Sequence, residues 1–133
     1  MTASEKKAEL ARYRIKQAEE SLEEAEFLLS GKKSPRSIIN RAYYAMFYAV
    51  LALLVYESYS SSKHSGVIGF FNKKFIKEKI FSEDLGRSIN SAFELRQRGD
   101  YREYFELSYE TVIPYIDKAR IFLAAVRDHL FQK

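Results

Sequence analysis

The sequence contains no cysteine and no tryptophan, and only two prolines and five glycines among 133 residues. Without cysteine the chain cannot form disulfides or thiolate metal sites. Its two histidines are far apart in the sequence, so we expect no metal site and no cofactor. The phosphate-binding loops GxxxxGK[S/T] and GxGxxG are also missing. These absences exclude standard nucleotide-loop enzymes and thiolate metalloproteins.

The sequence also has only one long apolar run and only a small excess of one charge. The 22 basic and 18 acidic residues leave a net charge of +4, which permits weak contact with nucleic acid but does not argue for it. The single long apolar run, over residues 42–56, is shorter than the roughly 20 residues that cross a bilayer. The chain is charged from Glu5 onward and lacks a signal-peptide pattern. We therefore expect a cytoplasmic protein that does not enter a membrane.

Apolar residues recur at helical spacing, and no run alternates with a period of two, so the sequence predicts an all-α fold. Gly31 and Gly99 are expected to end helices, and Ser34 to cap one. Pro114 is expected in a first turn or at a kink. No linker divides the chain, so residues 1–133 should form one domain. We expect five helices, over residues 5–30, 35–58, 63–77, 82–99 and from 108–113 to about 130.

The second expected helix is apolar on every side, as is typical of a helix that other helices surround. It carries one narrow stripe of small residues along which another backbone could approach, formed by Ala42, Ala45, Ala49 and Ala52. A neighbouring stripe brings hydrogen-bonding groups into this apolar helix and is formed by Ser37, Arg41, Tyr44 and Tyr48. We interpret the first stripe as a packing surface, and the second is a candidate for function.

The fourth expected helix has an apolar face that includes Ile89 and Ala92. Arg96 lies on the same face and interrupts it. A cation near a helix C-terminus can complement the helix dipole, and its long stem can reach water. Alternatively, Arg96 lies in a cleft with Asp100 and Tyr101 and binds a phosphate or a partner's carboxylate. The sequence leaves both interpretations open.

His64 lies on the apolar face at the start of the third expected helix, directly after Lys63. It is either a structural residue at a helix start or part of a site. The short connection between the third and fourth helices predicts an antiparallel hairpin. In that hairpin Lys63 and His64 would lie at the same end of the bundle as Arg96, Asp100 and Tyr101.

Arg41 and Tyr44 lie near the beginning of the second helix, roughly 20 Å from its C-terminus at about 1.5 Å per residue. We therefore expect them to be too far from His64 to share its cluster within one chain. Tyrosine is common on buried helix faces with its hydroxyl on a partner, so packing alone can account for Tyr44. Arg41 and Tyr44 are therefore a second candidate binding position. They would lie near His64 only in a dimer that brings opposite ends of two chains together.

Three segments together resemble the small stand-alone HEPN-domain proteins of archaea and bacteria. They are residues 37–49, S-x3-R-A-Y-Y-A-M-F-Y-A, residues 63–67, KHSGV, and residues 95–101, LRQRGDY. The resemblance extends from about residue 10 to 130. It implies an up-and-down bundle of five helices that forms a homodimer and is often encoded beside a minimal nucleotidyltransferase. Many HEPN proteins are toxins that cut RNA with an Arg-x4-6-His motif.

The sequence departs from that motif, because Tyr101, Arg102 and Glu103 occupy the positions where the histidine should follow Arg96. Tyrosine has a pKa near 10 and is a poor general base at neutral pH. We therefore expect a non-catalytic HEPN homodimer that binds a nucleotide, RNA or a nucleotidyltransferase in a toxin-antitoxin-like system. One alternative is a metal-independent ribonuclease in which His64 is the base, with His64, Arg96 and Tyr101 as catalytic candidates. A second alternative is a helical scaffold without a site.

Overall fold

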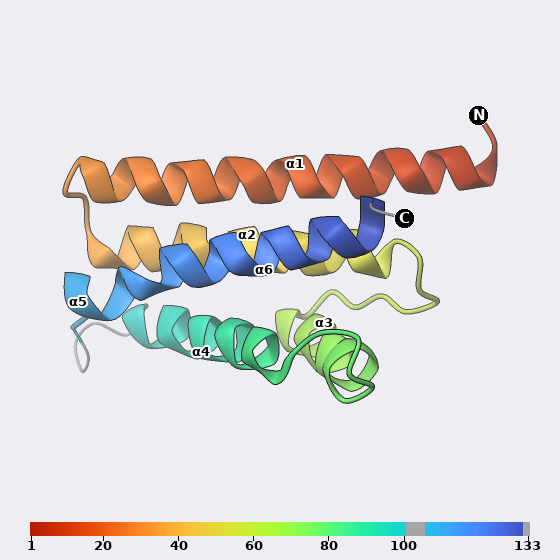
Figure 1. Ribbon diagram of the computed structural model, residues 1–133. Coiled ribbons are helices and arrows are strands. Elements are labelled where there is room, and N and C mark those ends of the chain that lie inside the picture. The colour runs from red at the N-terminus through yellow and green to blue at the C-terminus, as the bar shows by residue number, and fades with distance from the viewer. Residues whose placement is uncertain (101–105, 132–133) are drawn as a thin grey trace.

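A computed structural model describes residues 1–100 and 106–131, and these residues form an all-helical bundle (Figure 1). No strand occurs among them, so the predicted fold class is confirmed. Five helices make up the bundle. The third of them is extended by a π-helical segment, and a single-turn helix precedes the last one. In chain order the elements are α1 (Ala3–Ser30), α2 (Pro35–Leu54), α3 (His64–Phe71), the π-helical segment η1 (Asn72–Ile76), α4 (Glu83–Gly99), α5 (Tyr109–Val112) and α6 (Pro114–Phe131).

Local signals determine where α1 begins and ends. The Thr2 hydroxyl accepts the backbone N–H of Glu5, and the Glu5 carboxylate accepts the backbone N–H of Thr2, which forms a capping box. Gly31 follows the last turn, as predicted. One face of the helix is buried in the bundle by residues that recur every three or four positions, namely Ala11, Ile15, Ala18, Ser21 and Ala25.

The central helix of the bundle is α2, which contacts α1, α3, α4, α5 and α6. Ser34 caps it and Pro35 occupies its first turn, as predicted. The predicted alanine stripe is fully buried within the chain, at 0% exposure for Ala42, Ala45, Ala49 and Ala52. The stripe therefore packs inside the protomer and offers no surface for a second copy.

Among the described residues, α2 is the one helix long and apolar enough to span a membrane by length and composition. However, 67% of its most apolar window is buried inside the bundle. That environment is the one expected for the core helix of a helical domain.

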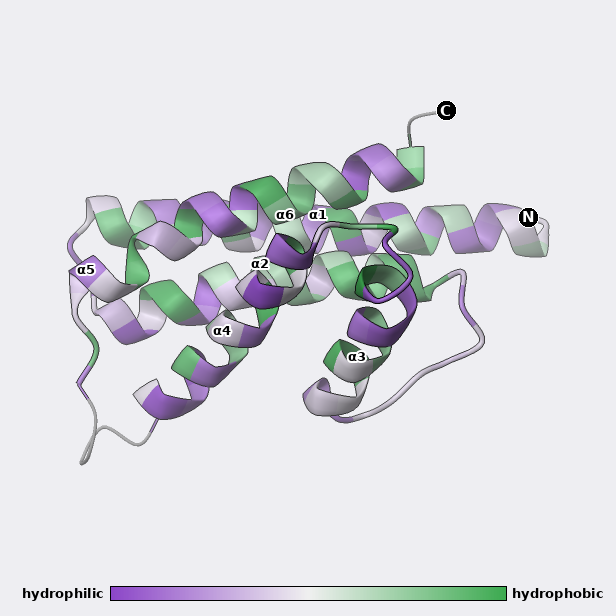
Figure 2. Ribbon diagram, turned by 60° about the horizontal axis from the view of Figure 1, so that its bottom comes forward, coloured by the Kyte–Doolittle hydropathy of each residue, from purple (hydrophilic) through white to green (hydrophobic). Residues whose placement is uncertain are grey.

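The third helix begins beside the middle of α2 rather than at its end. α2 ends at Leu54, before the predicted Ser58, and the connection over residues 55–63 returns along the bundle before α3 begins (Figures 1 and 2). As a result, the His64 ring stacks on Phe47 with 4.0 Å between ring centroids. α3 then continues into η1, so the predicted helix over 63–77 is nearly correct in extent.

The remaining helices close the bundle around α2. Ser82 and Gly99 bound α4 as predicted, and Phe93 of α4 lies near His64, with ring centroids 6.4 Å apart. The start of α3 therefore lies beside the later part of α4, as expected for the antiparallel hairpin. Pro114 begins α6 and separates it from the short α5, because proline lacks a backbone N–H and is tolerated in a first turn.

Candidate functional site

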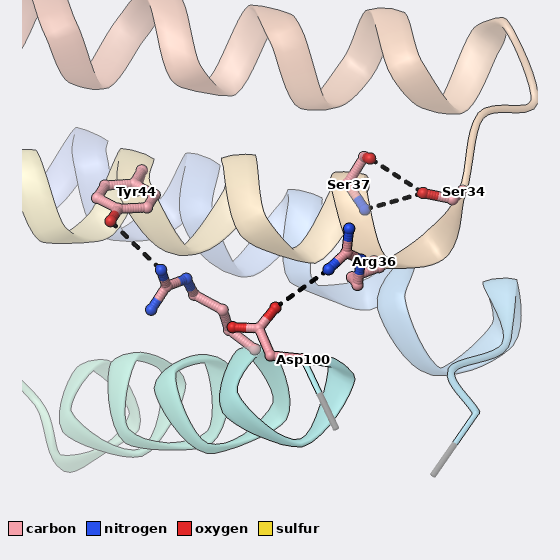
Figure 3. A network of polar contacts seen from close by, with 6 residues as sticks. Ser34, Arg36, Ser37, Tyr44 and Asp100 are labelled. Carbon is pink, nitrogen blue, oxygen red and sulfur yellow. Dashed lines mark hydrogen bonds and ion pairs between the residues drawn. The ribbon is translucent and has the colours of Figure 1, made fainter. Parts of the chain in front are cut away.

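The side chain of Arg96 extends from α4 onto two tyrosines of α2. Its guanidinium carbon lies 5.3 Å from the Tyr43 ring centroid and 5.2 Å from that of Tyr44, which are cation–π distances. Its Nη2 donates a long hydrogen bond of 3.4 Å to the Tyr44 hydroxyl (Figure 3). Its Nε is buried and has no hydrogen-bond partner among the residues that the structure describes. Among the described residues, no carboxylate forms an ion pair with Arg96.

His64 lies in the same cluster and is enclosed by aromatic rings. Its Nδ1 is 2.8 Å from the Tyr43 hydroxyl, and one face of its ring stacks on Phe47. The Tyr44 ring approaches it edge-on at 5.7 Å between centroids. Tyr43, Tyr44, His64 and Arg96 are called the Tyr-His-Arg cluster below. It combines one cation, one imidazole and two phenols from α2, α3 and α4.

The environment determines which groups in the cluster carry protons. Burial, and then the nearby charge of Arg96, lower the pKa of His64 from its usual 6.5, so the imidazole is neutral near pH 7. Burial raises the pKa of Tyr43 well above its usual 10, so its hydroxyl keeps its proton. A buried hydroxyl needs an acceptor, and His64 Nδ1 is within reach. We therefore assign the His64 proton to Nε2, which makes that nitrogen a hydrogen-bond donor.

The structure corrects the expected position of Tyr44. We expected Tyr44 and Arg41 to lie too far from His64 to share its cluster, but Tyr44 contacts both His64 and Arg96. The guanidinium of Arg41 lies 4.9 Å from the Tyr44 ring centroid and so borders the cluster. The expectation was wrong because it placed the start of the third helix at the C-terminal end of α2. The returning connection over residues 55–63 brings His64 back to the middle of α2.

One interpretation of the sequence placed Asp100 in a cleft with Arg96, but the structure shows no ion pair between these two described residues. The Asp100 carboxylate instead accepts from Nη1 of Arg36 at 3.4 Å, near the beginning of α2 (Figure 3). Lys63 is exposed and directly precedes α3, where its backbone N–H donates to Ser61 Oγ. Tyr101, the third catalytic candidate, lies outside the described residues.

Sequence reasoning missed the role of Tyr43. Its place within an apolar run indicated core packing, and its ring is indeed fully buried. Its hydroxyl, however, is the group that holds His64. A signal existed in the paired tyrosines at positions 43 and 44, since adjacent residues of a helix point about 100° apart and can contact two different neighbours. Within the described residues, no three His, Asp or Glu side chains are grouped to hold a metal ion.

Comparison with known proteins matches residues 11–129 to the HEPN domain. A UPF0332 protein of Thermotoga maritima is 42% identical over 120 residues, which cover 90% of each chain. A protein of Methanocaldococcus jannaschii named "Putative toxin MJ0142" is 37% identical over 119 residues, covering 90% of this chain and 80% of its own. A second one, "Putative toxin MJ0605", is 39% identical over 87 residues, covering 65% and 64%. The chain therefore belongs to the HEPN family.

The protonation state of His64 gives a pH-dependent prediction. Because the folded state lowers its pKa below the unfolded value of 6.5, the unfolded state binds the proton more readily as the pH falls. Neutral His64 therefore favours folding above about pH 6.5, and this contribution is lost as the pH falls through the folded-state pKa. Denaturant unfolding between pH 7.5 and 5 should show a smaller loss of stability for His64→Gln than for wild type.

His129→Gln is the matched control, because His129 is the other histidine and is exposed near the end of α6. This variant should keep the wild-type pH dependence. Equal slopes for wild type and His64→Gln would contradict the lowered pKa of His64.

Proposed function

We propose that this HEPN-family protein is a homodimeric module that binds a nucleotide or RNA through the Tyr-His-Arg cluster and does not cleave the RNA. The observation that carries the proposal is the state of Arg96. Its guanidinium rests on two tyrosine rings, and within the described part of the chain its buried Nε lacks a hydrogen-bond partner. Membership of the HEPN family and relatives named as toxins support a toxin-like or nucleotide-related role at a coarser level.

The chemistry of Arg96 favours a phosphate as its ligand. Guanidinium has five N–H donors in a planar fork that matches two oxygens of a phosphate. In Arg96 one of these donors makes a long bond to Tyr44, and Nε makes none. Because hydrogen bonds to charged acceptors are stronger than neutral ones, an anion would improve on these contacts. The half-buried Tyr48 ring, next to Tyr44, offers a surface on which a nucleobase can stack.

The state of His64 argues against cleavage. A ribonuclease needs a base that takes the proton of the 2′-hydroxyl, and a neutral imidazole can do so only through an unprotonated nitrogen. Here Nδ1 is occupied by the Tyr43 hydroxyl, and the assigned proton is on Nε2. In this state His64 donates a hydrogen bond to the ligand, which supports binding rather than catalysis.

A ribonuclease is the second candidate, favoured by the presence of His64 in the same cluster as Arg96. The lowered pKa of His64 keeps the imidazole neutral, as a base requires. If the Tyr43 hydroxyl accepted a hydrogen bond from Nδ1 instead of donating one, Nε2 would be available as the base. A minimal nucleotidyltransferase partner, which the family resemblance implies, is compatible with either function.

Substitution of Arg96 separates a binding residue from a structural one. We expect Arg96→Ala to weaken binding of uridine monophosphate and of oligouridylate at least tenfold. Stability should change by no more than about 1 kcal/mol, because the lost cation–π contact and the removed unsatisfied Nε oppose one another. Titration calorimetry and urea unfolding measure the two effects.

Arg87→Gln is the control, since Arg87 is an exposed arginine at the start of the same helix. It should leave both quantities unchanged. A large loss of stability in Arg96→Ala with binding intact would show that Arg96 is a structural residue.

Incubation with a structured RNA pool tests the absence of cleavage. We expect the wild-type protein to leave the RNA intact because His64 offers no unprotonated nitrogen to the ligand. Cleavage that is lost in both His64→Ala and Arg96→Ala would contradict the proposal and establish the ribonuclease function.

The homodimer is part of the proposal, although the alanine stripe cannot form its interface. The outer surface of α1 instead offers exposed apolar side chains at Leu10, Tyr13 and Phe27, which are 44%, 55% and 74% exposed. Light scattering at micromolar concentration should therefore give a mass twice that of the chain. A single species of 15.6 kDa would contradict dimerisation.

A further inference from the structure

A polar pocket lies beside the Tyr-His-Arg cluster, where the beginning of α2 meets α1 and the end of α4. It is lined by Leu28, Arg36, Ser37, Asn40, Arg41 and Asp100. Figure 3 shows Arg36 and Asp100 facing each other across this junction, with Ser37 nearby on α2. Two arginines on one helix therefore reach a single concave surface.

The ion pairs that the two arginines form there are weak and replaceable. Arg36 reaches Asp100 through one nitrogen at 3.4 Å, and both side chains are nearly half exposed, at 45% and 49%. Arg41 reaches Glu24 through one nitrogen at 3.2 Å, and Glu24 is 57% exposed. Ion pairs of this exposed kind contribute about 0–1 kcal/mol. A phosphate could displace either carboxylate and accept two N–H groups where the carboxylate accepts one.

The orientation of Arg41 is fixed in advance. Its Nε and Nη2 both donate to Asn40 Oδ1, at 3.2 and 3.0 Å. Its guanidinium also packs against the Tyr44 ring. An arginine held in this way loses less conformational freedom when it binds a ligand.

The pocket and the cluster are continuous through Tyr44. Arg41 and Arg96 approach the same Tyr44 ring, with centroid distances of 4.9 and 5.2 Å. From Tyr44 to Arg36 the α2 axis extends eight residues, or about 12 Å at about 1.5 Å per residue. Three cations therefore lie along α2: Arg96, which reaches it from α4, and Arg41 and Arg36 of α2 itself. Arg96 and Arg41 share the Tyr44 ring.

We propose that the Arg36–Arg41 pocket is a second phosphate subsite and that the ligand is a single-stranded oligonucleotide rather than a mononucleotide. This inference rests on the proposed binding of a phosphate by Arg96. A strand has phosphates separated by sugars, which matches cationic positions spaced along α2. The phosphates of a nucleoside triphosphate are contiguous and do not span the separation between Arg96 and Arg36.

Affinity as a function of ligand length tests the second subsite. Uridine monophosphate, uridine triphosphate and oligouridylates of two and four nucleotides are titrated into the wild-type protein and into Arg36→Gln/Arg41→Gln. We expect the double variant to bind the monophosphate within twofold of wild type and the tetranucleotide about tenfold more weakly. Its salt dependence for the tetranucleotide should fall, since each phosphate contact contributes about 0.7 to the slope for single strands.

The control is Arg12→Gln/Arg87→Gln, which removes the same charge from two exposed positions outside the pocket. This variant should bind the tetranucleotide like wild type.

Equal affinity and salt slope for wild type and Arg36→Gln/Arg41→Gln would overturn the second subsite and leave binding at Arg96 intact. Tighter binding of the triphosphate than of the tetranucleotide would also overturn it. Failure of every ligand to bind wild type would overturn the proposed function and this inference together.

Discussion

The enclosure of α2 by the other helices is the constraint on which the rest of the structure depends. An apolar helix has to be covered on every side, and burial of its side chains is the main favourable contribution to folding. The connection from α2 to α3 therefore returns along the bundle, so that α3 covers the middle of α2 instead of extending beyond it (Figure 1). The same return places His64 on Phe47 and against Tyr43, so the packing of the core and the assembly of the site have a single cause.

Within this apolar frame, the tyrosines determine the electrostatics of the site. Arg96 is held by the faces of aromatic rings and by one hydroxyl, whereas a buried arginine is usually matched by a carboxylate. The charge of Arg96 acts on its neighbour and, after burial, contributes to the lowered pKa of His64. A neutral imidazole that donates a hydrogen bond and a cation with an unused donor together favour an anionic ligand. The proposed second subsite extends the same chemistry toward the beginning of α2.

Local signals in the sequence predicted most of the helix boundaries. Ser34 accepts the backbone N–H of Ser37 within one turn, so its effect does not depend on distant residues, whereas Ser82 precedes α4 without such a side-chain bond. The position of His64 could not be predicted in this way, since it depends on the path of the connection over residues 55–63. Chain spacing alone likewise could not show that Asp100 turns to Arg36 instead of Arg96. The sequence left open whether Arg96 reaches water or lies in a polar cluster, because both suit an arginine near a helix C-terminus.

The central claim is that the guanidinium group of Arg96 binds an anion. The most direct measurement is the ¹⁵N–¹H NMR signal of Arg96 Nε, assigned by comparison with Arg96→Lys and followed during titration with uridine monophosphate. Our account predicts a saturable shift of this signal and slower exchange of its proton with water as the phosphate binds. Binding of the nucleotide with the Arg96 Nε signal unchanged would contradict it.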